Sequence, residues 1–339
     1  MKVRISDMNM KTWASELKTG KNRKSMPILS FPSVQLLGID VLQLISDSEL
    51  QAQGMKMIAD RVDTLASVSM MDLSVEAEAF GSTIRYSEVE VPTVTGHLIN
   101  NMEDAEALQV PAVGTGRTGK YIDAISKATK LILDRPVFAG VIGPFSLAGR
   151  LLDVSEAMIY CYDEPEMVHL ILNKVTEFIM NYIKAYKETG ANGVIIAEPL
   201  AGLLSPNLNS EFSIQYVKKI VESVQSDDFA VIYHNCGNSV PDMIDQIVTL
   251  QATAYHFGNA ISMKEVLDKV SPDIILMGNV SPAEIFNGTP ELVSELTQHI
   301  LDESGRYPNF VISTGCDIPP MSSWENIDAF FSTVKNFYE

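Results

Sequence analysis

Two apolar segments of this chain end in residue types that commonly bind transition metals. The first is followed by His234 and Cys236, and the second, 80 residues further on, is followed by Cys316. Residues two apart on a strand point to the same side, so His234 and Cys236 can face one ion. Imidazole and thiolate are preferred ligands of Zn²⁺, and three protein ligands leave the fourth position open, as in catalytic sites. The pattern indicates a catalytic zinc site; the alternative is a histidine and two cysteines that are simply buried.

The two segments belong to a longer alternation of short apolar runs with segments of helical periodicity. Short, continuously apolar strands are typical of a parallel sheet covered by helices. Two earlier runs, at 27–31 and 64–70, bring the number of expected strands to eight, which predicts an α/β fold of the (β/α)₈ TIM-barrel type. A doubly wound open sheet is the alternative. The later strands are expected at 137–142, 193–197, 230–233, 254–257, 274–277 and 310–313.

Polar residues at the ends of these strands favour the barrel over the open sheet. Glu198, His234 and Asn279 each follow or end an apolar run, and Cys316 follows the last one. In a barrel, the carboxyl ends of all strands meet at one mouth, where active sites lie. That geometry would bring Cys236 and Cys316 to the same ion despite their separation in sequence.

Two segments before residue 121 are also informative. The stretch 71–81 carries three carboxylates among apolar residues, and Asp72 is the one we expect to face a pocket, with exposure to solvent as the alternative. The stretch 82–120 contains a glycine-rich run at 114–120 that lacks the Gly-Lys-Ser/Thr ending of a phosphate-binding loop. We expect 82–120 to be a flexible excursion that could act as a lid.

The composition excludes several classes of protein. A net charge of −18 argues against a nucleic-acid partner, and three cysteines in 339 residues do not form a disulfide framework. The first residues lack an apolar signal core, and no apolar run approaches the roughly 20 residues that span a bilayer. We expect a soluble cytoplasmic protein with no membrane partner. We also expect one barrel domain over residues 1–339, with an N-terminal helical extension.

Four segments carry a resemblance that extends over nearly the whole chain. They are 72–81, 234–238, 278–282 and 313–317. In these segments the chain resembles the uroporphyrinogen decarboxylase superfamily, and within it the branch of methylcobalamin:coenzyme M methyltransferases. The superfamily is built on a (β/α)₈ barrel, and this branch is marked by His-x-Cys and a distant Cys that bind catalytic zinc. The resemblance implies that His234, Cys236 and Cys316 are the zinc ligands.

The sequence departs from the true decarboxylases at two places. Those enzymes resemble one another in an arginine-rich loop, whereas the corresponding stretch 28–35 has no arginine to pair with porphyrinogen carboxylates. They also carry Gly-His-Gly near the last strand, where this chain has Gly-Cys-Asp at 315–317. Asp72 matches the position of their pyrrole-binding aspartate. A uroporphyrinogen decarboxylase-like enzyme is therefore a disfavoured alternative.

The resemblance implies methyl transfer from a methylated corrinoid to a thiol. Zinc would bind the acceptor thiol and favour its thiolate, which would attack the methyl group of methylcobalamin and leave Co(I). Because the chain has no corrinoid-binding Asp-x-His-x-x-Gly motif, we expect the donor on a separate small corrinoid protein that docks over the mouth. Coenzyme M is the expected acceptor, and tetrahydrofolate is the alternative. A non-catalytic module would bind metal without turnover.

Further site residues are expected around the mouth. We expect catalytic roles for Asp72 and Glu198. The sulfonate of coenzyme M needs a cation, for which Arg150 is the nearest candidate. A structural role is the alternative for His256. The other residues expected to contact substrate, together with His256, are Tyr233 and Asn279.

Overall fold

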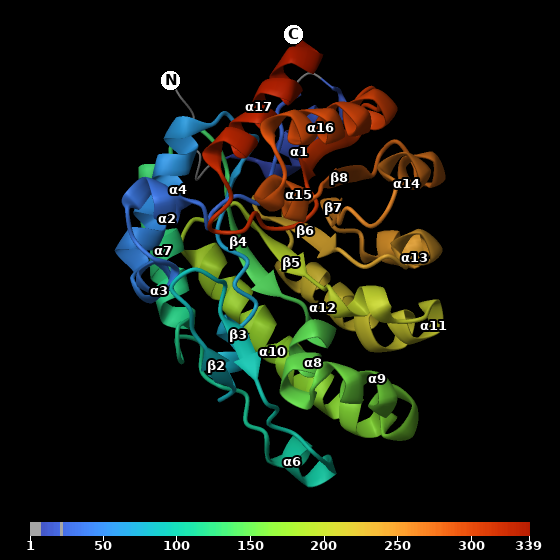
Figure 1. Cartoon of the computed structure of the whole chain (residues 1–339). Coiled ribbons are helices and arrows are strands. Elements are labelled where there is room, and N and C mark those ends of the chain that lie inside the picture. Colours follow the sequence, from blue (N-terminus) through green and yellow to red (C-terminus); the bar gives the residue numbers. More distant parts are fainter. Residues whose placement is uncertain (1–7, 21–22) are drawn as a thin grey trace.

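A curled parallel sheet forms the centre of the molecule. The computed structural model describes residues 8–20 and 23–339. Seven strands follow one another in the order β1-β4-β5-β6-β7-β8-β9, and helices cover the outer face of the curl (Figure 1). The strands are β1 Ser67–Val68, β4 Val137–Ile142, β5 Gly193–Ala197, β6 Ala230–Asn235, β7 Ala254–Phe257, β8 Ile275–Val280 and β9 Phe310–Thr314. A doubly wound sheet reverses its strand order at a switch point. This order contains no reversal, so the doubly wound alternative is wrong.

The helices begin where their sequences supply caps. Side chains of Asp40, Asp47 and Ser281 accept bonds from the first turns of α3, α4 and α15, and proline stands in the first turn of several others. The helices are α1 Met10–Lys18, α2 Ser33–Leu37, α3 Val41–Ser46, α4 Ser48–Arg61, α5 Val75–Ala79, α6 Met102–Ala107, α7 Thr118–Leu131, α8 Pro144–Leu152, α9 Val154–Asp163, α10 Pro165–Glu188, η2 Leu200–Leu203, α11 Pro206–Asn209, η3 Ser210–Ile214, α12 Gln215–Val224, α13 Val240–Ile247, η4 Val248–Leu250, α14 Met263–Lys269, α15 Pro282–Asn287, α16 Pro290–Ser304 and α17 Trp324–Tyr338.

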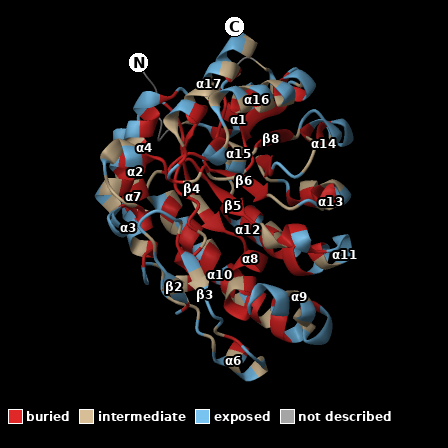
Figure 2. Cartoon of the chain, in the orientation of Figure 1, coloured by how far each residue is buried: buried red, intermediate tan, exposed pale blue. Residues whose placement is uncertain are grey.

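Both faces of the sheet are buried, because successive residues of each strand point to opposite sides. Figure 2 shows the buried strands beneath helices whose outer surfaces are exposed. One face packs against the helices; the other encloses a second apolar cluster. Side chains of α1 join this inner cluster, and the ring of Trp13 lies 5.7 Å from that of Phe138. The helix α1 therefore covers the end of the sheet at which the strands begin.

The segment before α2 lies between the two edges of the curled sheet. Its Ser25 carbonyl accepts a bond from Leu65 N (2.9 Å), just before β1, while Met26 N donates to Ile312 O (3.0 Å) of β9. The expected strand at 27–31 is nevertheless not formed. Pro27 has no N–H group, and Ile28 N donates to the hydroxyl of Thr314 (3.2 Å) instead of to a carbonyl, so the ladder is interrupted.

The remaining strand predictions differ from the structure in detail. The six strands from residue 137 onward are present, and the strand expected at 64–70 is shortened to β1. The stretch 82–120, for which the sequence predicts a flexible excursion, instead contains the antiparallel hairpin of β2 (Thr83–Arg85) and β3 (Thr93–Thr95), followed by α6. Within the described residues, no helix combines the length and apolar character that crossing a membrane requires.

The inner cluster predicts a specific cost for removing Phe138, its largest fully buried ring. Phe138 is fully buried, at 0% exposure, so Phe138→Ala should lower the free energy of unfolding by about 3–5 kcal/mol, because it leaves a cavity that the neighbours fill only partly. Urea unfolding followed by circular dichroism measures this. The control, Leu133→Ala, changes a side chain that is 69% exposed and should stay within about 0.5 kcal/mol of the unmodified protein. Equal effects of the two variants would contradict the assignment of Phe138 to the core.

Candidate metal centre and its polar surroundings

Three soft ligands converge at the carboxyl edge of the sheet. His234 lies near the end of β6, Cys236 directly follows that strand, and Cys316 follows β9. One ligand atom from each residue lies within 4.8 Å of the others. His234 is buried, and both cysteines are partly buried. In the described part of the chain, no other group of three histidine, cysteine or carboxylate side chains is placed to hold an ion.

Strand alternation separates the metal candidates from their neighbours. The side chain of Asn235 turns to the helix side, where its Nδ2 donates to the Tyr233 hydroxyl (3.1 Å). Its Oδ1 accepts from Gly237 N (2.9 Å), which turns the chain immediately after Cys236. Tyr233 also packs against the helix layer, on the opposite face of β6 from His234. The structure therefore places Tyr233 away from the position at which the sequence predicts substrate contact.

Glycines allow close packing around Cys236. A Cβ added to Gly237 would lie 2.4 Å from Gly202 Cα, and one added to Gly258 would lie 2.6 Å from Cys236 Cα. Such distances leave no room for a side chain, so backbone packs directly on backbone at both places. The loops after β5 and β7 thus hold the loop of Cys236 from two sides.

The two cysteines interact with each other. A hydrogen bond from the Cys316 thiol lowers the pKa of Cys236 to about 7. The same bond, together with burial, raises the pKa of Cys316 to about 12. The shared hydrogen bond therefore makes Cys236 the more acidic of the two thiols.

The ring of His234 has one nitrogen engaged and one free. Its Nδ1 lies 2.8 Å from His256 Nδ1. Its Nε2 is buried and has no hydrogen-bond partner among the described residues. A buried polar atom without a partner costs about 1–3 kcal/mol, and an ion held jointly with two thiolates would remove that cost. The donor set and the free nitrogen fit Zn²⁺.

His256 lies below this centre and is not exposed at a mouth. The residue is 1% exposed, and its Nε2 lies 2.8 Å from Ser313 Oγ. Burial, followed by the proximity of His234, holds the pKa of His256 well below its ordinary value. Both ring nitrogens of His256 have protein partners. His256 therefore contacts the metal candidate His234, and not a substrate as the sequence predicts.

Asp72 is fully engaged by a buried network. Its Oδ1 accepts from Ser74 N (3.1 Å) and Ser74 Oγ (2.6 Å), and its Oδ2 accepts from the Tyr121 hydroxyl (2.7 Å) and from the Arg117 guanidinium. Arg117 also pairs with Glu78 (2.5 Å). These contacts leave Asp72 without a free lone pair for proton transfer.

Arg117 is the site residue that the sequence does not predict. It stands in the glycine-rich run that suggests a loop, yet it is only 5% exposed. One signal in the sequence could have predicted its burial: three carboxylates in the apolar stretch 71–81 need a cation as partner if they are buried.

Arg150 and Glu76 lie beside the Asp72 network and have unpaired atoms. Arg150 projects from α8; burial lowers its pKa, and the carboxylates of Asp72 and Glu76 act in the opposite direction. Glu76 Oε1 accepts from Ile142 N (3.0 Å), while Glu76 Oε2 and Arg150 Nε have no hydrogen-bond partner among the described residues. Arg150 therefore has unused donor capacity, as its predicted role requires.

Glu198 and Asn279 brace the edge of the sheet. The Glu198 carboxylate accepts from Phe145 N (2.7 Å), Ser146 N (2.9 Å) and Ser146 Oγ (2.6 Å), so it binds the first turn of α8. Burial raises the pKa of Glu198 to about 7. Asn279 Nδ2 donates to the carbonyls of Gly258 and Ile261 (both 2.9 Å), in the loop that packs on Cys236. These side-chain contacts are structural. Glu198 also meets His234 through the backbone, where its N donates to His234 O (2.8 Å).

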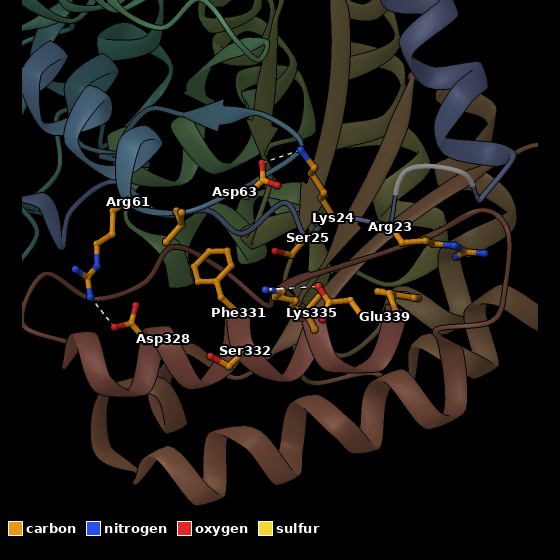
Figure 3. Close-up of a pocket in the computed structure, with 13 residues that line it drawn as sticks. Arg23, Lys24, Ser25, Arg61, Asp63, Asp328, Phe331, Ser332, Lys335 and Glu339 are labelled. Atoms are coloured by element: carbon orange, nitrogen blue, oxygen red, sulfur yellow. Dashed lines mark hydrogen bonds and ion pairs between the residues drawn. The ribbon is translucent and has the colours of Figure 1, made fainter.

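A separate hollow of about 750 Å³ contains none of the predicted site residues. It lies between the segment at 23–25, the end of α4 and the face of α17 (Figure 3). Most of its charged groups are ion-paired: Lys24 with Asp63 (2.7 Å), Arg61 with Asp328 (2.5 Å) and Lys335 with Glu339 (3.5 Å). Arg23 donates instead to the backbone carbonyls of Gly20, Gly305 and Tyr307. We assign it no binding role.

Comparisons with known proteins agree on one family. The family model for uroporphyrinogen decarboxylase matches residues 24–337. The methylcobamide:CoM methyltransferase MtbA of Methanosarcina acetivorans is 30% identical over 271 residues, which span 78% of each chain. The uroporphyrinogen decarboxylase of Hydrogenovibrio crunogenus is 24% identical over 309 residues, spanning 86% of this chain and 84% of that one. A solved methyltransferase from Methanosarcina mazei superposes with a TM-score of 0.84 at 25% identity, over 98% of this chain and 100% of that one.

The buried Glu76 predicts a pH dependence of stability. Burial raises its pKa from 4.5 to about 7 in the folded protein, so between these values the folded state keeps a proton that the unfolded chain releases. Stability should therefore fall as pH rises through this window. Relative to Glu76→Gln, which cannot titrate, the unmodified protein should lose up to about 3 kcal/mol between pH 4.5 and 8. Urea unfolding of both proteins across that range measures the difference, and a difference that stays constant or grows in favour of the unmodified protein would contradict it.

Proposed function

The chain belongs to the uroporphyrinogen decarboxylase family, and from that premise we propose that it is a zinc-dependent methyltransferase that moves a methyl group from a protein-bound methylated corrinoid to a thiol such as coenzyme M. The observation that carries this proposal is the convergence of His234, Cys236 and Cys316. The name of the Methanosarcina acetivorans relative supplies the donor and acceptor classes.

The proposal includes a closed (β/α)₈ barrel as a single domain over residues 1–339. The segment at 25–30 would close the barrel between β9 and β1 without being a regular strand, supported by the bond of Ser25 to Leu65 on one side and of Met26 to Ile312 on the other. The helix α1 would be an N-terminal extension that covers the end opposite the metal candidates. The carboxyl ends of the strands would then form the mouth over which a corrinoid protein docks.

The chemistry divides between the metal and the protein. When bound by His234, Cys236 and Cys316, zinc supplies a Lewis acid that favours the thiolate form of the acceptor at neutral pH. The acceptor sulfur forms the new bond to the methyl carbon, while the carbon–cobalt bond breaks and its electron pair stays on cobalt. The chain's own residues hold the reactants in line and exclude water. The low pKa of Cys236 favours the thiolate that such a centre requires.

The remaining candidates receive different roles. Arg150 is the proposed contact for an anionic group of the acceptor, since its Nε has no partner among the described residues. Asp72 and Glu198, predicted as catalytic, are engaged by Arg117 and by α8, so we propose that they position these elements. Asn279 would position the loop that packs on Cys236.

Metal content and methyl transfer test the proposal together. Protein purified without added metal should contain about one zinc per chain and should transfer methyl from methylcobalamin to coenzyme M. Cys316→Ala should lose or weaken zinc binding and lose transfer with it, because one thiolate ligand is gone. The matched control is Cys161→Ala in α9, where burial raises the thiol pKa to about 12 and removes it from metal chemistry. That variant should keep both properties.

The outcomes separate the parts of the proposal. Zinc without transfer to coenzyme M would keep the metal centre and move the search to other acceptors, beginning with tetrahydrofolate. Absence of zinc from a folded, unmodified protein would overturn the metal centre, and with it the zinc-dependent mechanism. Equal loss in the Cys316 and Cys161 variants would show that the effect is not specific to the proposed ligand.

A further inference from the structure

A chain of hydrogen bonds runs beneath the proposed metal centre, from Met26 through Ser313 and His256 to His234. We propose that His256 and Ser313 are positioning residues that fix the tautomer of His234 and so present the lone pair of its Nε2 to the metal. This inference rests on the proposed zinc centre, but it concerns protons of the protein itself. It also replaces the substrate-binding role that the sequence suggests for His256.

The donor in each of these hydrogen bonds can be assigned by starting from the carbonyl of Met26. Ser313 Oγ lies 2.7 Å from Met26 O. A carbonyl oxygen can only accept, so the single hydroxyl proton of Ser313 points to Met26. His256 Nε2, which lies 2.8 Å from the same Ser313 oxygen, must then be the donor. His256 therefore carries a proton on Nε2.

The contacts of His234, at the other end of the hydrogen-bond chain, independently assign the same tautomer to His256. His234 Nδ1 lies 3.3 Å from the carbonyl oxygen of His256, which again can only accept. His234 Nδ1 is also 2.8 Å from His256 Nδ1, and two ring nitrogens at that distance share one proton between them. Both contacts are satisfied when Nδ1 of His234 is the donor and Nδ1 of His256 is the acceptor.

The consequence falls on the atom that has no partner. A neutral imidazole carries one proton, so His234 with a proton on Nδ1 has a bare lone pair on Nε2. Nε2 is the nitrogen that is buried without a partner among the described residues. The opposite tautomer would point a lone pair of His234 at both a carbonyl and a second lone pair, which is repulsive. The hydrogen-bond chain therefore selects the tautomer of His234 whose Nε2 can bind a metal.

Sheet register, burial and apolar packing stabilise this tautomer of His234. His234 and His256 are directly paired neighbours on β6 and β7, so the sheet register sets their contact. Both histidines and Ser313 are buried. The apolar side chains of Ile232, Ala254 and Val311, two residues earlier on the same three strands, belong to the inner cluster beneath. In such apolar surroundings a mismatched donor or acceptor is costly.

Nitrogen NMR of the full-length protein tests the tautomers directly. Long-range ¹H–¹⁵N correlations of metal-free protein labelled at histidine report which ring nitrogen carries the proton, and His234 and His256 are assigned by single substitutions. We expect His234 protonated at Nδ1 and His256 at Nε2. A proton on Nε2 of His234 would overturn the inference. The readout needs neither zinc nor activity, so failure of the proposed function leaves it intact.

Zinc affinity tests whether the hydrogen bonds of His256 and Ser313 strengthen metal binding by His234. His256→Leu removes the acceptor for His234 and should weaken zinc binding, measured against a chromophoric chelator, by about 10- to 100-fold. His256→Asn can place its amide oxygen where Nδ1 was and should recover part of the loss. Ser313→Ala should weaken binding less, because the direct partner of His234 remains.

A matched control removes a buried polar group from the same strand. Tyr255→Phe deletes a hydroxyl that bonds to Ala252 N (3.2 Å) and Val248 O (3.0 Å) on the helix side, away from the chain. It should leave zinc affinity and both tautomers unchanged. Circular dichroism checks folding; if His256→Leu does not fold, the Asn and Ala variants still decide. Folded variants of His256 that bind zinc as tightly as the unmodified protein would overturn the positioning role.

Discussion

The direct packing of backbone on backbone at the carboxyl ends of β5, β6 and β7 is the constraint on which the site depends. Gly202 meets Gly237, and Gly258 meets Cys236, at separations that no side chain could occupy. The loops can approach this closely only because glycine has no side chain at the points of contact. The position of Cys236 is thereby set by neighbouring loops, and its distance from Cys316 follows from the curvature of the sheet. Ligand geometry is thus a property of the fold and not of one short motif.

Buried charge around the site follows a second rule. Two carboxylates at this edge are fully matched by donors: Glu198 by the first turn of α8, and Asp72 by Arg117, Tyr121 and Ser74. Such pairs add little net stability, but removing one partner leaves an uncompensated charge and costs about 3–5 kcal/mol. They therefore specify how α7 and α8 dock against the sheet. Glu76 and Asp317 each keep one buried oxygen without a partner among the described residues, and burial raises the pKa of both.

Periodicity and ligand chemistry predict most of what lies after residue 137. Alternation along β6 correctly separates His234 from Asn235, and the same rule applied one residue earlier would have placed Tyr233 on the helix side. Other features have no local signal. The burial of Arg117 depends on carboxylates some 40 residues away in sequence, and the missing strand at 27–31 depends on Pro27 and on a hydroxyl of Thr314. Tertiary partners decide both, so pattern alone cannot.

The contact between Ser313 and Met26 joins residues 287 positions apart in the chain. Contacts of such long range are slow to form, because closing so long a loop costs entropy before the contact repays it. A growing polypeptide that has not yet produced β9 lacks Cys316 and also lacks the hydroxyl that begins the alignment of His234. His234 and Cys236 alone would offer an ion only two ligands, one of them free to turn. At the proposed centre, the full ligand set and the alignment of His234 would therefore both require β9.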